Sequence, residues 1–332
     1  MTQRLTIIGI GEVLWDVFPD GKRFGGAPAN VVYHAQMLGA QAVLVSCVGN
    51  DSYGKQICDT LGEKSMEAKG VAIDLQHSTG TVTVTIDKEG GAKYSIADDV
   101  AWDYIPWTNV LANLALHANA VCFGTLAQRH PQSLNTIRRF LTSAPISCLR
   151  VFDVNLRQNY YSRELVLDSL KFSNVLKINN EELAILASYI TNKNLPEFEL
   201  LNEFIRVFNL DIVALTKGKD GCVIASQKEI VSCPGFKTVV KDTVGAGDAF
   251  TAAMILGLLK GLELQRVANI ACQIGAYVCS QSGATPPISQ SLVQDLYLLS
   301  SKQKATPNLP AFKCLRLNRK VEDNYDSSKR KI

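Results

Sequence analysis

The chain has 332 residues, 47% hydrophobic and 20% charged, so it can bury a large core and is not a disordered protein. Its net charge of +3 comes from residues 302–332, which hold nine Lys/Arg and three Asp/Glu, and the remaining body at −3 is not typical of a nucleic-acid-binding protein. The sequence has nine cysteines without a CxxC pair and four scattered histidines, and it shows no signal peptide and no membrane-length apolar run. These features predict a cytoplasmic protein with reduced thiols, no zinc site and no membrane contact.

The amino-terminal residues predict a buried β–α–β unit. A strand over residues 5–8 leads into a glycine-rich stretch at 25–30. The helix that follows ends at Gly39, as helices commonly end at glycine, and residues 42–48 form a continuous apolar run. Such a run is typical of a strand buried in a parallel sheet.

A different pattern follows at residues 81–86, where polar and β-branched side chains alternate as in a half-exposed strand. A turn at 88–91 allows residues 92–96 to return as an antiparallel strand. We expect this hairpin to project from the body as part of a small β lid, formed by residues 12–30 and 79–103.

From residue 120 onward, predicted strands and helices alternate. The strands cover 120–123, 149–153, 174–178 and 211–216, and the helices cover 131–141, 162–172, a stretch from Asn180, 245–260 and 265–280. Alternation on this scale predicts an α/β fold with a doubly wound, mainly parallel sheet and helices on both faces. One domain is expected over residues 1–304, followed by a basic, disordered tail over 305–332.

Two common nucleotide-binding loops are absent. The string GIGEVL at residues 9–14 begins like a dinucleotide fingerprint, but Leu14 stands where the third glycine is needed, which disfavours a nicotinamide oxidoreductase. The string GNDSYGKQ at residues 49–56 begins like a P-loop, but Gln56 replaces the hydroxyl residue that would bind magnesium. A plain turn from strand to helix is the better interpretation there.

The segment richest in chemistry is KDTVGAGDAFTAAMIL at residues 241–256. Its small residues Gly245, Ala246 and Gly247 precede an apolar helix, whose first N–H groups form an anion site. Asp248 lies beside this anion site, where a carboxylate can accept a hydroxyl proton while N–H groups stabilise a transferring phosphoryl group. Alternatively, Asp248 only complements the helix dipole, and these residues alone favour neither interpretation.

Two strings far apart in the chain resemble one family. Residues 241–256 resemble the carboxy-terminal signature of the ribokinase-like, or PfkB-type, carbohydrate kinases, and FGGAPANVVYHAQMLG at residues 24–39 resembles the amino-terminal signature. The resemblance covers about residues 5–290 and implies an ATP-dependent sugar kinase. It also implies that Asp248 is the general base and that Gly245, Ala246 and Gly247 form an anion hole for the γ-phosphate.

The same resemblance implies a sugar-binding group, made of Asp16, Gly25, Gly26, Asn30 and Arg157. A carboxylate can accept two neighbouring hydroxyls, and glycine lets backbone amides approach the sugar. Without the resemblance, the two glycines would be interpreted as a turn, Asn30 as a helix cap and Arg157 as a surface ion-pair partner.

For ATP and its metal ions, the resemblance implies two further groups. The ATP-binding residues would be Asn179, Thr216, Gly218, Gly221 and Cys272, the last at a position where relatives usually carry asparagine. The metal-binding residues would be Glu182, which holds Mg²⁺ through water, and Asp242, Val244 and Gly283, which hold a monovalent cation, K⁺. From the residues alone, positions 179–182 are a capped helix start and 216–221 a simple turn.

Shorter strings favour the fructokinase branch of the family. GEVLWD at residues 11–16, VAWD at 100–103 and FDVNLR at 152–157 each resemble that branch. Fructose is therefore the expected substrate, and pairing of two lids in a homodimer is a further expectation, because a β lid exposes sheet edges. The alternatives are a kinase of the same fold for ribose, 2-keto-3-deoxygluconate or adenosine, and a kinase-like binding protein without catalysis.

Overall fold

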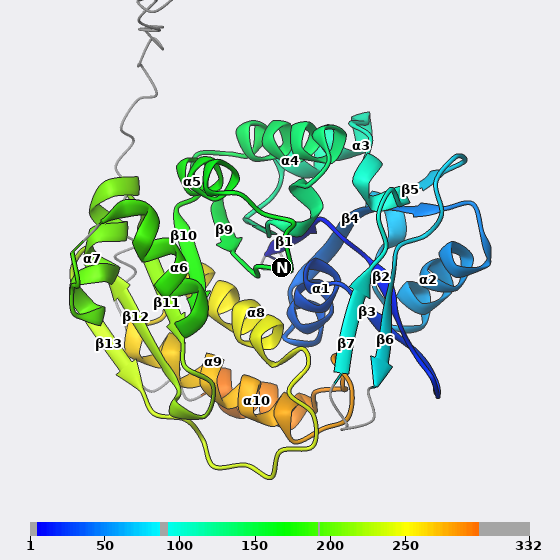
Figure 1. Cartoon of the computed structure of the whole chain (residues 1–332). Helices are drawn as coiled ribbons and strands as arrows, with labels where there is room; N and C mark the ends of the chain where they lie inside the picture. Colours follow the sequence, from blue (N-terminus) through cyan, green and yellow to red (C-terminus); the bar gives the residue numbers. More distant parts are fainter. Residues whose placement is uncertain (1–4, 87–91, 192, 299–332) are drawn as a thin grey trace, which may run out of the picture.

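A nine-stranded sheet forms the centre of the protein, which a computed structural model describes over residues 5–86, 92–191 and 193–298 (Figure 1). Its two outermost strands at one edge pair antiparallel, and the other seven run parallel. The order is β13 (Ile230–Cys233), β12 (Cys222–Ser226), β11 (Ile212–Thr216), β10 (Val175–Asn179), β9 (Leu149–Asp153), β8 (Ala120–Phe123), β1 (Thr6–Ile10), β4 (Gln41–Gly49) and β5 (Val71–Asp74).

Helices cover both faces of this sheet, because its strands are apolar on both sides. Ile7 packs into one core and its neighbour Ile8 into the other. One core includes side chains of α1 (Ala27–Met37), α2 (Ser52–Glu63), α8 (Ala246–Leu259) and α9 (Leu264–Cys279), with α10 (Gln290–Leu298) packed against it. The other includes side chains of α3 (Asn109–Leu116), α4 (Pro131–Ser143), α5 (Arg163–Lys171), α6 (Asn180–Ile190) and α7 (Glu197–Phe208).

A second, four-stranded sheet lies beside α1, at the right in Figure 1. Its order is β3 (Gly21–Gly25), β2 (Leu14–Phe18), β6 (Thr81–Ile86) and β7 (Ala92–Ile96). The hairpin expected over residues 81–96 is confirmed, since β6 and β7 pair antiparallel from Val82 with Ile96 to Ile86 with Ala92. The turn expected at 88–91 lies outside the described residues.

The predicted fold class is confirmed: a large, mainly parallel sheet lies between two helical layers, with a small second sheet at its side. The predicted strands and helices are present with shifts of a few residues at their ends. The turn from strand to helix expected at residues 49–56 is confirmed, since it joins β4 to α2, but the sequence did not lead us to α3, α7, α10, β5 or the antiparallel pair β12 and β13. Across residues 5–86, 92–191 and 193–298, no helix has both the length and the apolar character that a bilayer crossing requires.

Candidate functional site

The first turn of α8 offers backbone amides to an anion. Gly245 caps this helix with a φ of 80°, and a Cβ atom there would lie 2.3 Å from the carbonyl oxygen of Ala284, so only glycine fits. The first intrahelical bond runs from the Ala249 N–H to the Gly245 oxygen at 2.9 Å. The amides of Gly247 and Asp248 precede that bond and have no acceptor in the helix, whereas the Ala246 N–H already donates to the Thr243 oxygen at 3.3 Å.

Asp248 and Asn30 lie in direct contact, although 218 residues separate them in the chain. The Asn30 Nδ2 donates to the Asp248 Oδ2 at 2.8 Å, which joins α1 to the first turn of α8. Burial and the neighbouring Asp153 raise the pKa of Asp248 to about 6, while the Asn30 hydrogen bond, Lys177 and Arg157 oppose the rise. At neutral pH the carboxylate is therefore mostly ionised and able to take a proton.

The predicted sugar-binding residues lie on β2, at the end of β3, at the start of α1 and in the segment after β9. Asp16 lies on β2, and Gly25 lies on the neighbouring strand β3. A Cβ atom on Gly25 would lie 2.5 Å from the Asp16 Oδ2, so a side chain at position 25 would displace the Asp16 carboxylate. Burial raises the pKa of Asp16 to about 6, against the attraction of Arg157 and Arg23. The next residue, Gly26, has a φ of 106° and begins α1, which carries Asn30.

Glu12, which carried no predicted role, also faces Asp248. Burial raises the pKa of Glu12 to about 7, with Arg157 lowering it and Asp248 raising it. Arg157 therefore acts on Glu12, Asp16 and Asp248 together. Glu12 Oε2 and Asn30 Oδ1 are buried and have no hydrogen-bond partner among the described residues. A ligand hydroxyl that reached either oxygen could donate to it.

The predicted ATP-binding residues on the large sheet lie at the carboxyl ends of its strands and in the turn that follows. Asn179 ends β10 and is paired in register with Thr216, which ends β11, and Thr216 is paired in turn with Cys222 on β12. Gly218 and Gly221 follow in a tight turn with φ values of 56° and 92°. These are the carboxyl ends of parallel strands, where open α/β sheets bind their ligands.

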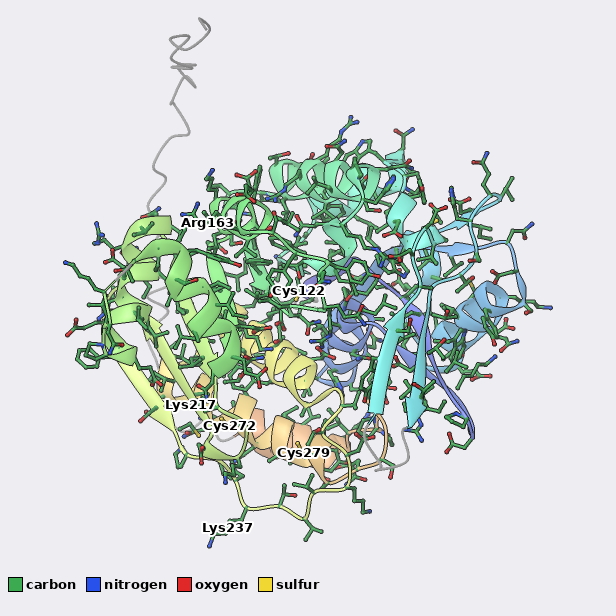
Figure 2. All side chains as sticks on the ribbon, in the orientation of Figure 1. Cys122, Arg163, Lys217, Lys237, Cys272 and Cys279 are labelled. Atoms are coloured by element: carbon green, nitrogen blue, oxygen red, sulfur yellow. The ribbon has the colours of Figure 1, made fainter. Side chains whose placement is uncertain are left out.

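Cys272, labelled in Figure 2, lies on α9 and contacts Cys222, the first residue of β12. Its Sγ is 3.4 Å from the Sγ of Cys222. The contact with Cys222, followed by burial, raises the pKa of Cys272 well above its ordinary value, so the thiol is neutral.

The two predicted metal-binding groups are held by backbone amides. Glu182 accepts from the N–H of Leu156 through Oε1 at 3.0 Å and from the N–H of Asn179 through Oε2 at 2.9 Å, forming a capping box on α6. Asp242 accepts from Val244 and Gly283 at 3.0 and 3.1 Å. The expected trio for a monovalent cation is therefore brought together, and Glu182 acts as a helix cap.

Sequence reasoning missed three buried polar residues beneath the first turn of α8. Lys177 on β10 forms an ion pair with Asp153 on β9, and Asp153 accepts a hydrogen bond from Thr251 on α8. A signal was present, because Lys177 interrupts an otherwise apolar strand and a buried charge requires a partner. The sequence alone did not name that partner.

The family model for "pfkB family carbohydrate kinase" matches residues 11–291. The chain belongs to this family. It is a carbohydrate kinase and a phosphotransferase, and the matched region includes the residues described above.

Individual relatives of this carbohydrate kinase are distant and span nearly the same length. A sugar kinase of Pyrococcus horikoshii is 29% identical over 297 residues, which cover 84% of this chain and 91% of the relative. The solved structure of that protein in complex with ATP has a TM-score of 0.73 at 25% identity and covers 88% of this chain and 100% of its own.

Two further relatives carry named activities. An ATP-dependent 6-phosphofructokinase of Thermoanaerobacterium thermosaccharolyticum is 27% identical, covering 85% of this chain and 90% of the relative. A fructokinase of Salmonella typhimurium is 26% identical, covering 83% of this chain and 93% of the relative.

Proposed function

We propose that this carbohydrate kinase transfers the γ-phosphoryl group of ATP to a primary hydroxyl of fructose, giving fructose 6-phosphate, with Asp248 as the general base. The observation that carries the proposal is the 2.8 Å hydrogen bond between Asn30 and Asp248. It joins the family's two signature segments, because it holds the carboxylate at the tip of α8 against α1, the helix that follows Gly25 and Gly26. The fructokinase relative and the three fructokinase-like strings support fructose as the substrate.

In this proposal the phosphoryl group passes directly from ATP to the sugar. Asp16 and Asn30 orient the sugar, and Asp248 accepts the proton of the attacking hydroxyl. The sugar oxygen bonds to the γ-phosphorus as the bond from that phosphorus to the bridging oxygen of ADP breaks. Amides of the segment Gly245, Ala246 and Gly247 would stabilise the charge on the phosphoryl group; the Gly247 amide has no acceptor in the helix, whereas the Ala246 amide would first have to release the Thr243 oxygen.

The nucleotide would lie over the strand ends at Asn179 and Thr216, in contact with the turn at Gly218 and Gly221 and with Cys272. The P. horikoshii structure with ATP supports this ligand. Glu182 suits water-mediated Mg²⁺, because each of its oxygens accepts one amide and keeps a second lone pair. Mg²⁺ would neutralise charge on the phosphates. Asp242, Val244 and Gly283 would hold K⁺, since carboxylate and carbonyl oxygens suit hard cations.

The direct test is ADP release from ATP with fructose, comparing the parent with Asp248→Asn. We expect turnover to fall by at least ~100-fold, in line with loss of a positioned base, while the KM for fructose changes little. Asp59→Asn, on the exposed face of α2, is the matched control and should keep parental turnover. Parental turnover in Asp248→Asn would refute the assignment of the base.

A second candidate substrate is fructose 6-phosphate. The 6-phosphofructokinase relative favours it, as does the attraction of both Arg23 and Arg157 for the Asp16 carboxylate, because arginine binds phosphate well. A panel of fructose, fructose 6-phosphate, ribose, 2-keto-3-deoxygluconate and adenosine decides by the ranking of kcat/KM. Fructose should rank first, and a chain that forms no ADP with any of them would be a kinase-like binding protein.

A further inference from the structure

Three buried polar side chains connect the large sheet to the first turn of α8. The Lys177 Nζ and the Asp153 Oδ1 are 2.9 Å apart, and the Asp153 Oδ2 accepts from the Thr251 Oγ1 at 2.8 Å. The same hydroxyl lies 3.0 Å from the carbonyl oxygen of Gly247. Lys177, Asp153 and Thr251 are only 8%, 4% and 0% exposed. We refer to these three residues as the strut.

The strut meets α8 at the residue that precedes the proposed base. A Cβ atom on Gly247 would lie 3.3 Å from the Lys177 Nζ, so the ammonium lies directly against the helix backbone. Asp153 has one oxygen on the lysine and the other on the threonine, which fixes its orientation. Burying two charges is costly, and apolar residues would hold a helix equally well. The arrangement therefore calls for a role beyond stability.

We propose that Thr251, Asp153 and Lys177 are positioning residues, which hold the first turn of α8 so that Asp248 and the amide of Gly247 keep their reacting geometry. The inference rests on the proposed function. Without the Thr251 hydroxyl, α8 loses its hydrogen bond to Asp153 on the sheet, and the first turn of the helix becomes free to shift. Displacement of a reacting group by about 1 Å lowers rates by up to ~100-fold.

The strut also sets the charge around Asp248. Facing that carboxylate are Glu12 from the segment before β2, Asn30 from α1, Asp153 from β9, Lys177 from β10 and Arg157 from the segment after β9. Although burial lowers it, the carboxylates of Asp153, Glu182 and Asp248 raise the pKa of Lys177 above its ordinary value, so the ammonium stays charged. Its removal leaves Asp153 uncompensated, and the negative charge then disfavours ionisation of Asp248.

The decisive variants are Thr251→Val, which keeps the shape and removes the hydroxyl, and Thr251→Ser, which keeps the hydroxyl. We expect Thr251→Val to lower kcat with fructose by about 10- to 100-fold with less than ~3-fold change in KM, and Thr251→Ser to restore kcat to within ~3-fold of the parent. The matched control is Thr142→Val, which removes an exposed hydroxyl bonded to carbonyls within α4. It should leave kcat unchanged.

A second measurement does not depend on activity. Hydrogen exchange at the amide of Ala249, which bonds Gly245 at 2.9 Å, should be at least ~10-fold faster in Thr251→Val and parental in Thr251→Ser. Unchanged exchange, or faster exchange with parental kcat, overturns the proposal. If the parent protein phosphorylates no sugar, the proposed function and the catalytic role of the strut both fail. Hydrogen exchange at Ala249 would still show whether the strut holds the first turn of α8.

Lys177→Met provides the electrostatic test, with Lys171→Met as its control. Lys171 forms an exposed ion pair with Asp168 at the same 2.9 Å distance. We expect the acid limb of the kcat profile to move to higher pH in Lys177→Met and to stay in place in Lys171→Met. An unmoved limb in a folded Lys177→Met protein would overturn the electrostatic part of the proposal.

Discussion

The hydrogen bond from Asn30 to Asp248 should set the pH range of the reaction. It stabilises the ionised carboxylate, so its removal raises the pKa of Asp248 above the present value of about 6. We choose Asn30→Leu, because leucine fills a similar volume and offers no donor. A hydrogen bond to a charged group contributes about 1.5–3 kcal/mol, which corresponds to a rise of roughly 1–2 pKa units.

The size of the effect follows from the ionised fraction at a given pH. At pH 6.5, a base with a pKa near 6 is ~0.75 ionised, and a rise of one to two units lowers that fraction to ~0.24 or ~0.03. Turnover should therefore fall roughly 3- to 25-fold at pH 6.5 through ionisation alone. This part of the loss should disappear near pH 9, where the carboxylate is ionised in both proteins, and any loss that remains reports the contact of Asn30 with the sugar.

The assay is kcat for the sugar between pH 5 and pH 9.5, measured by direct ADP detection. Asp16 also has a raised pKa of about 6 and Glu12 one of about 7, so the profile contains overlapping ionisations. Asp16→Asn serves as the reference, because it removes one of them and leaves the Asn30 contact in place. If Asn30→Leu only rescales the profile without moving its acid limb, Asn30 binds substrate but does not tune the base.

Three further predictions concern neighbouring residues. Burial lowers the pKa of His34 to about 4. Below pH 6.5 this histidine is therefore protonated in the unfolded chain and neutral in the folded protein, so about 2 kcal/mol of the free energy of unfolding should be lost between pH 7 and pH 5. Denaturant unfolding should show that His34→Gln lacks this loss while the exposed His117→Gln keeps it. Gly25→Ala should displace the Asp16 carboxylate and raise the KM for sugar about 10-fold or more in steady-state assays, whereas Gly62→Ala, with open space around it, should not. Glu12→Gln should leave the acid limb of the kcat profile in place, because Glu12, with a pKa of about 7, is mostly neutral where Asp248 titrates near 6; an acid limb that moves would contradict this.

The sequence predicted the elements whose signals are local. The apolar run of β4 and the alternating residues of β6 were recognised because burial on both faces or on one face leaves a distinct pattern. The antiparallel strands β12 and β13 are five and four residues long and lack the fully buried apolar run that marked the equally short β8, so they were not detected. Position at the edge of the sheet is a property of the whole fold.

The candidate site divides in the same way. Asp248 was found because glycines, a helix start and an acidic residue stand together within four positions. Its contact with Asn30 depends on the packing of α1 against α8, which no local pattern contains. The ion pair of Lys177 with Asp153 was not predicted for the same reason, since Asp153 is 24 residues away and lies on the adjacent strand.

Structural and proposed catalytic roles coincide in Glu182, and physical reasoning suggests why this is an advantage. A free glutamate loses about 1.5–2 kcal/mol of rotamer entropy when a ligand fixes it. Here the amides of Leu156 and Asn179 already fix both carboxylate oxygens of Glu182. Binding of a metal-bound water would therefore cost little additional side-chain entropy. The capping box on α6 is then part of the metal site, and the choice between a helix cap and a metal contact is not exclusive.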